Sequence, residues 1–252
     1  MPAPHNPFKA RLTTGETQIG LWVSLADASV AELAAQCGFD WMVIDGEHGP
    51  NGLRDVMDQL RAVAERTHPV VRVRDDDRAR IKQMLDIGAQ TILVPMVESA
   101  EQAREAVRSM LYPPAGVRGV GAMLGRATGY GAIGDYLATA NDEVCLLVQV
   151  ENRKGLAALD EILTVEGVDG VFIGPADLTA DMGYGTNSAA PEVQEAIRDA
   201  IARIRAAGRA AGILSTDPAV ARRYAEQGVA FLAVGTDVGV LGAGLRALRA
   251  GF

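Results

Sequence analysis

In "WMVIDGEHGP", residues 41–50, a short apolar run is followed by two carboxylates and an imidazole: Asp45, Glu47 and His48. These side-chain types move protons and bind hard cations in active sites. Other apolar runs also end in polar residues: Arg72 in "PVVRV", Glu151 in "CLLVQVE" and Asp177 shortly after "GVFIGP". What these groups can do together depends on whether the fold brings the run ends to one place.

The elements that must position these residues are short apolar runs that alternate with amphipathic stretches. There are eight runs: "GLWVSL" (20–25), "WMVIDGE" (41–47), "PVVRV" (69–73), "TILVPM" (91–96), "CLLVQVE" (145–151), "GVFIGP" (170–175), "AAGILS" (210–215) and "FLAVGT" (231–236). Helical patterns such as "GLRDVMDQLRAVAERT" lie between them, and several close with the glycine typical of a helix end. Eight strand-then-helix units in 252 residues predict an α/β fold, a single (β/α)8 barrel over residues 1–252, with an open doubly wound sheet as the weaker alternative.

One segment interrupts this alternation. Residues 112–142, "YPPAGVRGVGAMLGRATGYGAIGDYLATAND", are long and glycine-rich. We expect an irregular loop between the fourth and fifth strands that serves as a lid or as an interface element.

In such a barrel, the polar residues that end the strands meet at one face, where the chemistry takes place. The chain has three lysines, Lys9, Lys82 and Lys154. None is well placed to project from a strand into the barrel, as a Schiff-base aldolase requires. His5 is expected in the tail and His68 at the opposite face, which argues against a zinc site built on several imidazoles and leaves His48 as the one candidate catalytic histidine.

Carboxylate chemistry remains. Glu151 and Asp177 are expected on neighbouring strands, spaced about 4.8 Å apart, where they could hold one hard cation together. Two carboxylates with open coordination positions suit Mg²⁺ or Mn²⁺ and a chelating substrate. Plainer roles stay open: Asp177 could cap the next helix, and Arg153 instead of a metal could neutralise Glu151. Likewise, Arg72 could form a rim salt bridge and His48 could cap a helix.

Composition narrows the function classes. A formal charge of -8, without a cluster of basic and aromatic residues, argues against a nucleic-acid or anionic-membrane surface. Cys37 and Cys145 lie in apolar stretches and are expected to be reduced core residues. The N-terminus has no signal-type apolar region and no run approaches the length of a membrane span, so we expect a soluble, cytoplasmic protein.

Several stretches, in this order, resemble the HpcH/HpaI family of class II pyruvate aldolases, in particular 4-hydroxy-2-oxoheptanedioate aldolases and related hydroxy keto acid aldolases. They are "GLWVSL", "DWMVIDGEHGPN", "PVVRV", "IKQMLDIGAQTILVPMVESAEQAREAV", "YPPAGVRGVG", "LVQVEN", "VEGVDGVFIGPADLTADMGY" and "GILSTD". The resemblance covers nearly the whole chain. It implies a (β/α)8 barrel whose C-terminal helix is exchanged between partners, and a hexamer built as a trimer of dimers.

The resemblance also implies roles for individual residues. Glu151 and Asp177 match the metal ligands, Arg72 matches the carboxylate-binding arginine, and Asp45 with His48 matches the acid/base dyad. The other substrate-binding positions are Trp22, Gln149, Gly174, Pro175, Ala176 and Leu214. Asp86 resembles a residue that reaches a neighbouring subunit's site. For Glu47, which the resemblance does not assign, the residues themselves leave two roles open: contact with a water on the metal, or a place against the barrel wall. The charged "VRVRDDD" and the glycine-rich "RATGYGAIGDY" depart from the family pattern and could alter the choice of acceptor.

The implied reaction is the reversible aldol cleavage of a 4-hydroxy-2-keto acid into pyruvate and an aldehyde, as in aromatic compound catabolism. Mg²⁺ or Mn²⁺, with Co²⁺ as a substitute, would stabilise the pyruvate enolate. Arg72 would bind the substrate carboxylate as a bidentate fork, and Asp45 would orient the His48 ring. Two alternatives remain: an oxaloacetate decarboxylase or CoA-ester lyase that uses the same enolate, and a barrel that binds a small anion without catalysis. The physiological aldehyde and the stereochemical preference are not determined by the sequence.

Overall fold

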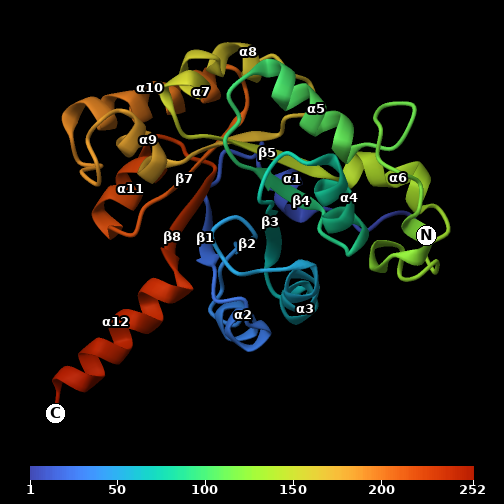
Figure 1. Cartoon of the computed structure of the whole chain (residues 1–252), viewed down its shortest axis with the longest axis horizontal. Coiled ribbons are helices and arrows are strands. Elements are labelled where there is room, and N and C mark those ends of the chain that lie inside the picture. The colour runs from blue at the N-terminus through green and yellow to red at the C-terminus, as the bar shows by residue number, and fades with distance from the viewer.

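The computed structural model describes the backbone of residues 1–252 and the side chains of residues 1–121 and 123–252. Its centre is a closed barrel of parallel strands in the order β1-β2-β3-β4-β5-β6-β7-β8 (Figure 1). The strands are β1 Gln18–Val23, β2 Trp41–Asp45, β3 His68–Arg72, β4 Thr91–Val94, β5 Cys145–Val150, β6 Gly170–Ile173, β7 Ala210–Leu214 and β8 Phe231–Thr236. The ring confirms the predicted (β/α)8 barrel, and each of the eight predicted runs overlaps one strand.

Helices return the chain along the outside of the barrel after each of the strands β1 to β7 (Figure 1). The α-helices are α1 Pro7–Arg11, α2 Ala28–Ala35, α3 Leu53–Val63, α4 Arg78–Asp86, α5 Ala100–Met110, α6 Tyr136–Glu143, α7 Arg153–Ala157, α8 Leu159–Leu163, α9 Pro175–Asp181, α10 Pro191–Ala206, α11 Pro218–Glu226 and α12 Asp237–Ala250. Two short 3₁₀ helices, η1 Ala122–Leu124 and η2 Arg126–Thr128, precede α6. The apolar outer faces of the strands pack against these helices and form the main core.

Aromatic side chains fill the inside of the barrel. Phe231 lies 5.7 Å from Trp41 and 6.0 Å from Phe172, measured between ring centroids. Glycine makes room for them: a Cβ at Gly20 would overlap the Trp41 ring, and one at Gly212 would overlap the Phe231 ring. At the amino-terminal end of the barrel, Phe8 of α1 packs against Trp41 and Phe231 and closes that end. The lumen is therefore packed, and the polar strand ends gather at its other end.

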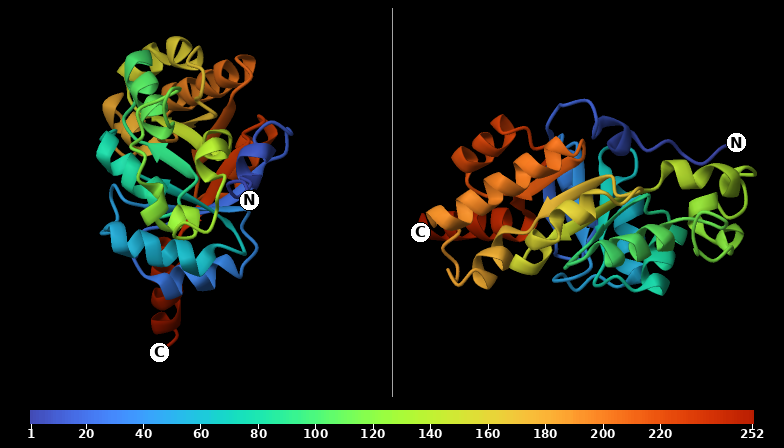
Figure 2. Two further views of the ribbon diagram at one scale, coloured as in Figure 1. Left: turned by 90° about the vertical axis from the view of Figure 1, so that its right-hand side faces the viewer. Right: turned by 90° about the horizontal axis from the view of Figure 1, so that it is seen from above.

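The segment 112–142 differs from the prediction in two ways. It contains α6 and two 3₁₀ helices, so it is not irregular throughout. It also lies at the amino-terminal end of the barrel, beside the N-terminal residues (Figure 2), where the Ala3 N–H donates to Thr139 Oγ1 at 2.8 Å. It therefore cannot be a lid over the carboxyl-terminal mouth of its own barrel, so the lid prediction was wrong, and the alternative, an interface element, stays a prediction.

The last helix, α12, leaves the barrel. It projects away from the other helices in Figure 1 and in the left view of Figure 2, and none of residues 238–252 is buried. Its exposed apolar side chains are Val238, Val240, Leu241, Leu245 and Leu248. This chain alone does not cover the apolar face of α12.

Two further expectations concerned the burial of the cysteines and the absence of a segment long enough to span a membrane. Cys145 is buried as predicted, but Cys37 is exposed at the end of α2, so its assignment to the core was wrong. Neither forms a disulfide. Among the helices of the described residues, none is long and apolar enough to cross a membrane.

Candidate active site

Strand pairing brings Asp45 and Arg72 together at the mouth of the barrel. They are direct partners in the parallel register of β2 and β3. The Arg72 Nε donates to Asp45 Oδ1 at 2.8 Å, and its Nη2 donates to Oδ2 at 2.7 Å. Trp22 completes the group, because its Nε1 donates to Asp45 Oδ2 at 3.2 Å and its ring lies 4.8 Å from the Arg72 guanidinium carbon. Only 6% of Arg72 and 2% of Asp45 are exposed, so this is a buried pair and not a salt bridge on the rim.

Arg72 keeps N–H groups that could bind an anionic ligand, although two carboxylates lie beside it. Burial would raise the pKa of the Asp45 carboxyl, but hydrogen bonds and charge from Arg72 hold that pKa below its ordinary value. Glu47 Oε2 lies 2.7 Å from Arg72 Nη1, and burial raises the pKa of Glu47 despite that positive charge. A guanidinium has five N–H groups, of which Asp45 uses two. N–H groups on both Nη1 and Nη2 therefore remain for a ligand carboxylate.

The structure does not bring the Asp45 carboxylate to the imidazole of His48. The ring is 68% exposed, and its Nε2 lies 3.9 Å from Glu47 Oε2. Asp45 Oδ1 accepts instead from the backbone N–H of His48 at 3.4 Å. His48 does not cap the next helix either, because Gly52 is the N-cap of α3. In this geometry Asp45 orients Arg72, and Glu47 is the acid nearest to the His48 ring.

Glu151 follows β5 and is 2% exposed. Its Oε1 accepts from the Met96 backbone N–H at 2.9 Å, and its Oε2 accepts from Gln149 Nε2. Burial raises the pKa of the Glu151 carboxyl, and the negative charge of Asp177 raises it further. Arg153, considered as a neutralising partner, pairs with Asp181 at 3.0 Å. Both hydrogen-bond donors to Glu151 are thus neutral groups.

Asp177 stands beside Glu151 because β5 and β6 are neighbours and the turn after β6 is tight. A Cβ at Gly174 would lie 2.6 Å from Glu151 Cβ, so only glycine lets the segment after β6 approach the segment after β5 this closely. The N-cap of α9 is Gly174, without a side-chain bond, and Asp177 lies in the first turn. Within the described part of the chain, the Asp177 carboxylate has no hydrogen bond or ion pair. A capping role for Asp177 is therefore not observed.

The donor set fits a hard divalent cation. Among the described residues, no group of three or more His, Cys, Asp and Glu side chains could hold a metal ion. The protein would therefore supply the two carboxylates Glu151 and Asp177, and Mg²⁺ is commonly bound through one or two carboxylates with water and substrate. Two further buried acceptors here have room for a donor: Gln149 Oε1 has no hydrogen-bond donor in the described structure, and Glu47 Oε2 makes only its ion pair with Arg72. Water on a cation could supply those donors.

The remaining predicted residues divide between the two ends of the barrel. Pro175 and Ala176 begin α9, and Leu214 ends β7, half-buried against the aromatic lumen cluster. Asp86, in contrast, ends α4 at the amino-terminal end, where it accepts from the buried Arg118 at 2.8 Å. It is therefore remote from the mouth of its own barrel.

Two residues of the mouth were not predicted as site residues. Asp237, the first residue of α12 directly after β8, is 5% exposed and accepts from the backbone N–H groups of Ser24 and Leu25. Asp237 fixes the turn after β1. Because β8 pairs with β1 in the ring, the position of Asp237 directly after β8 could have indicated this contact. Met96 contributes a backbone N–H to Glu151, and its side chain gives no such signal.

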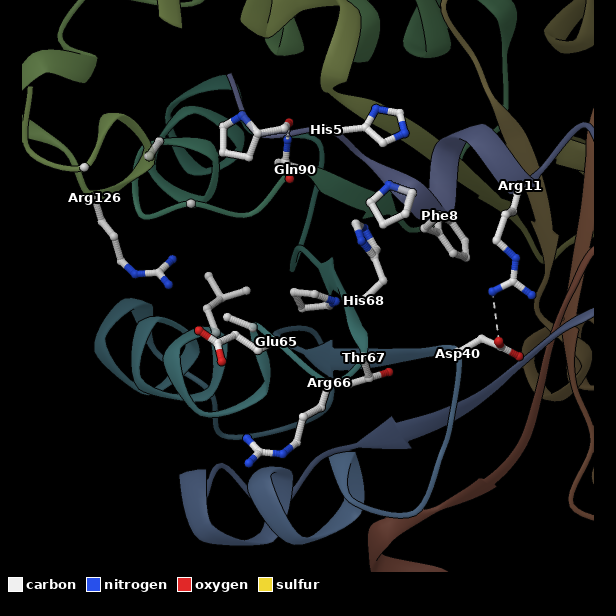
Figure 3. Close-up of a pocket in the computed structure, with 18 of the residues that line it drawn as sticks. His5, Phe8, Arg11, Asp40, Glu65, Arg66, Thr67, His68, Gln90 and Arg126 are labelled. Atoms are coloured by element: carbon white, nitrogen blue, oxygen red, sulfur yellow. Dashed lines mark hydrogen bonds and ion pairs between the residues drawn. The ribbon is translucent and has the colours of Figure 1, made fainter. Parts of the chain in front are cut away.

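A cavity lies at the other end of the barrel. It measures about 880 Å³ and is lined by His68, Gln90, Arg126 and residues of the N-terminal segment (Figure 3). His68 lies there as predicted and stacks on Phe8 at 5.2 Å, and burial lowers its pKa to about 4. Glu151, Asp177 and Arg72 do not line this cavity. We assign the chemistry to the mouth, because in barrels of this type catalysis takes place at the carboxyl ends of the strands.

Comparison with known proteins identifies the family. The family described as HpcH/HpaI aldolase/citrate lyase matches residues 18–243. A hydroxypyruvate/pyruvate aldolase of Pseudomonas aeruginosa is 59% identical over 253 residues, covering 100% of this chain and 94% of the relative. A 4-hydroxy-2-oxo-heptane-1,7-dioate aldolase of Shigella sonnei is 55% identical over 248 residues, covering 98% and 95%. The crystal structure of an HpcH/HpaI aldolase/citrate lyase family protein from Burkholderia cenocepacia J2315 superposes with a TM-score of 0.93 at 41% identity, covering 97% of this chain and 98% of that one. The chain therefore belongs to the HpcH/HpaI aldolase/citrate lyase family.

Proposed function

We propose that this protein is a metal-dependent carbon–carbon lyase, a class II aldolase that reversibly cleaves 4-hydroxy-2-keto acids into pyruvate and an aldehyde. The observation that carries the proposal is the pairing of Glu151 and Asp177 at the same mouth as a buried arginine, Arg72, with N–H groups to spare. The aldolase names of the relatives from Pseudomonas aeruginosa and Shigella sonnei support the same reaction class.

Glu151 and Asp177 are the residues that would hold the cation, Mg²⁺ or Mn²⁺, with Co²⁺ as a substitute. Held there, the cation would supply the positive charge that makes the methyl protons of pyruvate more acidic. Gln149, which already donates to Glu151, keeps one carboxylate oxygen of that pair in place. The backbone of Gly174–Ala176 and the Leu214 side chain are proposed to line the keto acid.

Arg72 binds the substrate carboxylate through the N–H groups that Asp45 leaves free, and a planar fork suits that anion better than an ammonium group would. Asp45 and Glu47 hold the guanidinium in place, and the Trp22 ring supports one of its faces. His48 is proposed to take the proton from the 4-hydroxyl oxygen during cleavage and to return it to the aldehyde oxygen during condensation. Its exposed ring can reach substrate, and Glu47 is its acidic neighbour.

The test combines proton exchange with cleavage. In deuterated water containing Mg²⁺, the protein should exchange the methyl protons of pyruvate, which NMR detects, and it should add pyruvate to one or more members of an aldehyde panel. Hydroxypyruvate is included as a donor because a relative is named for it. Chelation should abolish both activities, and Mg²⁺, Mn²⁺ or Co²⁺ should restore them.

Four outcomes would overturn the proposal. Full activity in chelator, or trapping of a pyruvate adduct by borohydride, would exclude a metal-dependent aldolase. Absence of methyl exchange would leave an anion-binding barrel. Decarboxylation of oxaloacetate without reaction with any aldehyde would identify a decarboxylase.

We also propose that the protein assembles and is cytoplasmic. The uncovered apolar face of α12 supports the exchange of this helix between partners. We propose a hexamer made as a trimer of such dimers. In such an assembly Asp86, which lies away from its own mouth, is proposed to approach the site of a neighbouring subunit.

A further inference from the structure

The turn after β4 has an unusual backbone. Met96 has a φ of 54°, in the left-handed region that residues other than glycine seldom adopt. Its side chain is 44% exposed, so burial of that side chain does not account for the conformation. The Met96 N–H, however, donates to Glu151 Oε1 at 2.9 Å. The costly backbone conformation thus coincides with a hydrogen bond to a proposed metal ligand.

Gln102, in the first turns of α5, closes this turn from both sides. Its Oε1 accepts from the Glu98 N–H at 2.9 Å, and its Nε2 donates to the Met96 carbonyl at 3.2 Å. Between these two contacts, the Val97 N–H donates to the Gln149 carbonyl of β5 at 2.9 Å. One side-chain amide therefore holds the residues on either side of position 97 while the turn is bonded to the neighbouring strand.

We propose that Gln102 and the left-handed residue at position 96 are positioning residues that orient the Glu151 carboxylate for a divalent cation. This inference rests on the proposed function. Each Glu151 oxygen accepts one neutral donor, the Met96 N–H or Gln149 Nε2, and these two bonds fix the plane of the carboxylate. Each oxygen keeps acceptor capacity, so the fixed carboxylate can bind a cation together with Asp177. Partners that orient a metal ligand in this way strongly affect metal affinity.

The first test is the affinity for Mn²⁺ without substrate, measured from the electron paramagnetic resonance signal of free Mn²⁺. Gln102→Leu should weaken Mn²⁺ binding by about 10- to 100-fold, the usual effect of removing a group that orients a ligand. Gln90→Leu is the matched control. The Gln90 Nε2 also donates to a backbone carbonyl, that of Pro4, but at the amino-terminal end of the barrel, so its loss should not change the affinity.

The second test changes the backbone preference at position 96. Met96→Val should weaken Mn²⁺ binding, because a β-branched residue strongly disfavours positive φ. Met96→Gly should restore binding close to that of the wild type, because glycine adopts this conformation readily. A side-chain role for Met96 would give the opposite order. Should Met96→Val fail to fold, the comparison of Gln102→Leu with Gln90→Leu decides alone.

Glu151→Gln separates failure of the inference from failure of the proposed function. If Glu151→Gln loses Mn²⁺ while folded Gln102→Leu and Met96→Val bind it like the wild type, the positioning role is refuted and the metal site stands. If Glu151→Gln binds Mn²⁺ like the wild type, the metal site itself is wrong and both proposals fall.

Discussion

Asp45→Asn separates the two roles that Asp45 could have. The substitution keeps the shape of the side chain, removes its charge and places an NH₂ group where one carboxylate oxygen now accepts from Arg72. The two bonds at 2.8 and 2.7 Å cannot both survive, since an NH₂ group facing the guanidinium is a donor opposite a donor. Arg72 would keep only Glu47 as an anionic partner.

The loss of unfolding free energy in Asp45→Asn can be estimated from the burial of the Asp45–Arg72 pair. Breaking one side of a buried ion pair costs about 3 to 5 kcal/mol of unfolding free energy. Unfolding entropy near 2.1 cal/mol/K per residue amounts to about 0.5 kcal/mol/K for 252 residues, so the melting temperature should fall by about 6 to 9 °C. Because Arg72 would lose its orientation, the KM for pyruvate should rise by up to about 100-fold.

The assays are thermal unfolding and steady-state kinetics of aldol addition with pyruvate varied at saturating Mg²⁺ and aldehyde. His48→Gln is the control, since it changes the imidazole and leaves the Asp45–Arg72 pair intact. An Asp45→Asn variant with normal melting temperature and normal KM for pyruvate, but with kcat reduced by about 10² to 10⁴, would refute this reasoning. It would restore Asp45 as the partner of the His48 ring.

Four further outcomes are expected. Arg72→Ala should lower kcat/KM for pyruvate by about 30-fold to several thousand-fold, equivalent to about 2 to 5 kcal/mol, and Arg72→Lys should recover little of it because an ammonium group cannot form the fork. His48→Ala should depress kcat by about 10² to 10⁴ while calorimetric titration finds pyruvate affinity nearly intact, because proton transfer assists only the transition state. Burial lowers the pKa of His68 from 6.5 to about 4, so between these pH values the unfolded chain binds a proton that the folded chain excludes. The unfolding free energy should therefore decline by up to about 3 kcal/mol as the pH falls from about 6.5 to about 4. Urea unfolding at pH 7 and 4.5 should show a smaller decline for His68→Gln than for the wild type. Leu241→Glu with Leu245→Glu on the exposed face of α12 should reduce the assembly size seen by light scattering, and an unchanged size would exclude exchange of that helix.

The strands could be predicted because a parallel strand inside a barrel is buried on both faces and reads as a continuous apolar run. All five residues of β2 are buried, for example. The same reasoning missed α6, where only Tyr136 and Ala140 are buried, so no apolar stripe of helical period marks it among the glycines that precede it. Strand ends were placed up to two residues too far, as at Glu47 and Met96, because the chain continues past its last ladder bond.

The partner of Asp45 was harder to predict than its location. His48 is three positions away in the sequence, but it lies in a turn where its ring faces solvent. Arg72 is 27 positions away, yet strand register sets it directly across from Asp45 in a buried site. A buried carboxylate is costly unless a charged donor meets it, and a rigid guanidinium fork meets both oxygens at once. Register, counted from Trp41 opposite His68, would therefore have predicted the pair better than proximity in sequence did. No such count finds Met96, because what it gives the site is a backbone N–H and a rare φ, which the identity of its side chain does not encode.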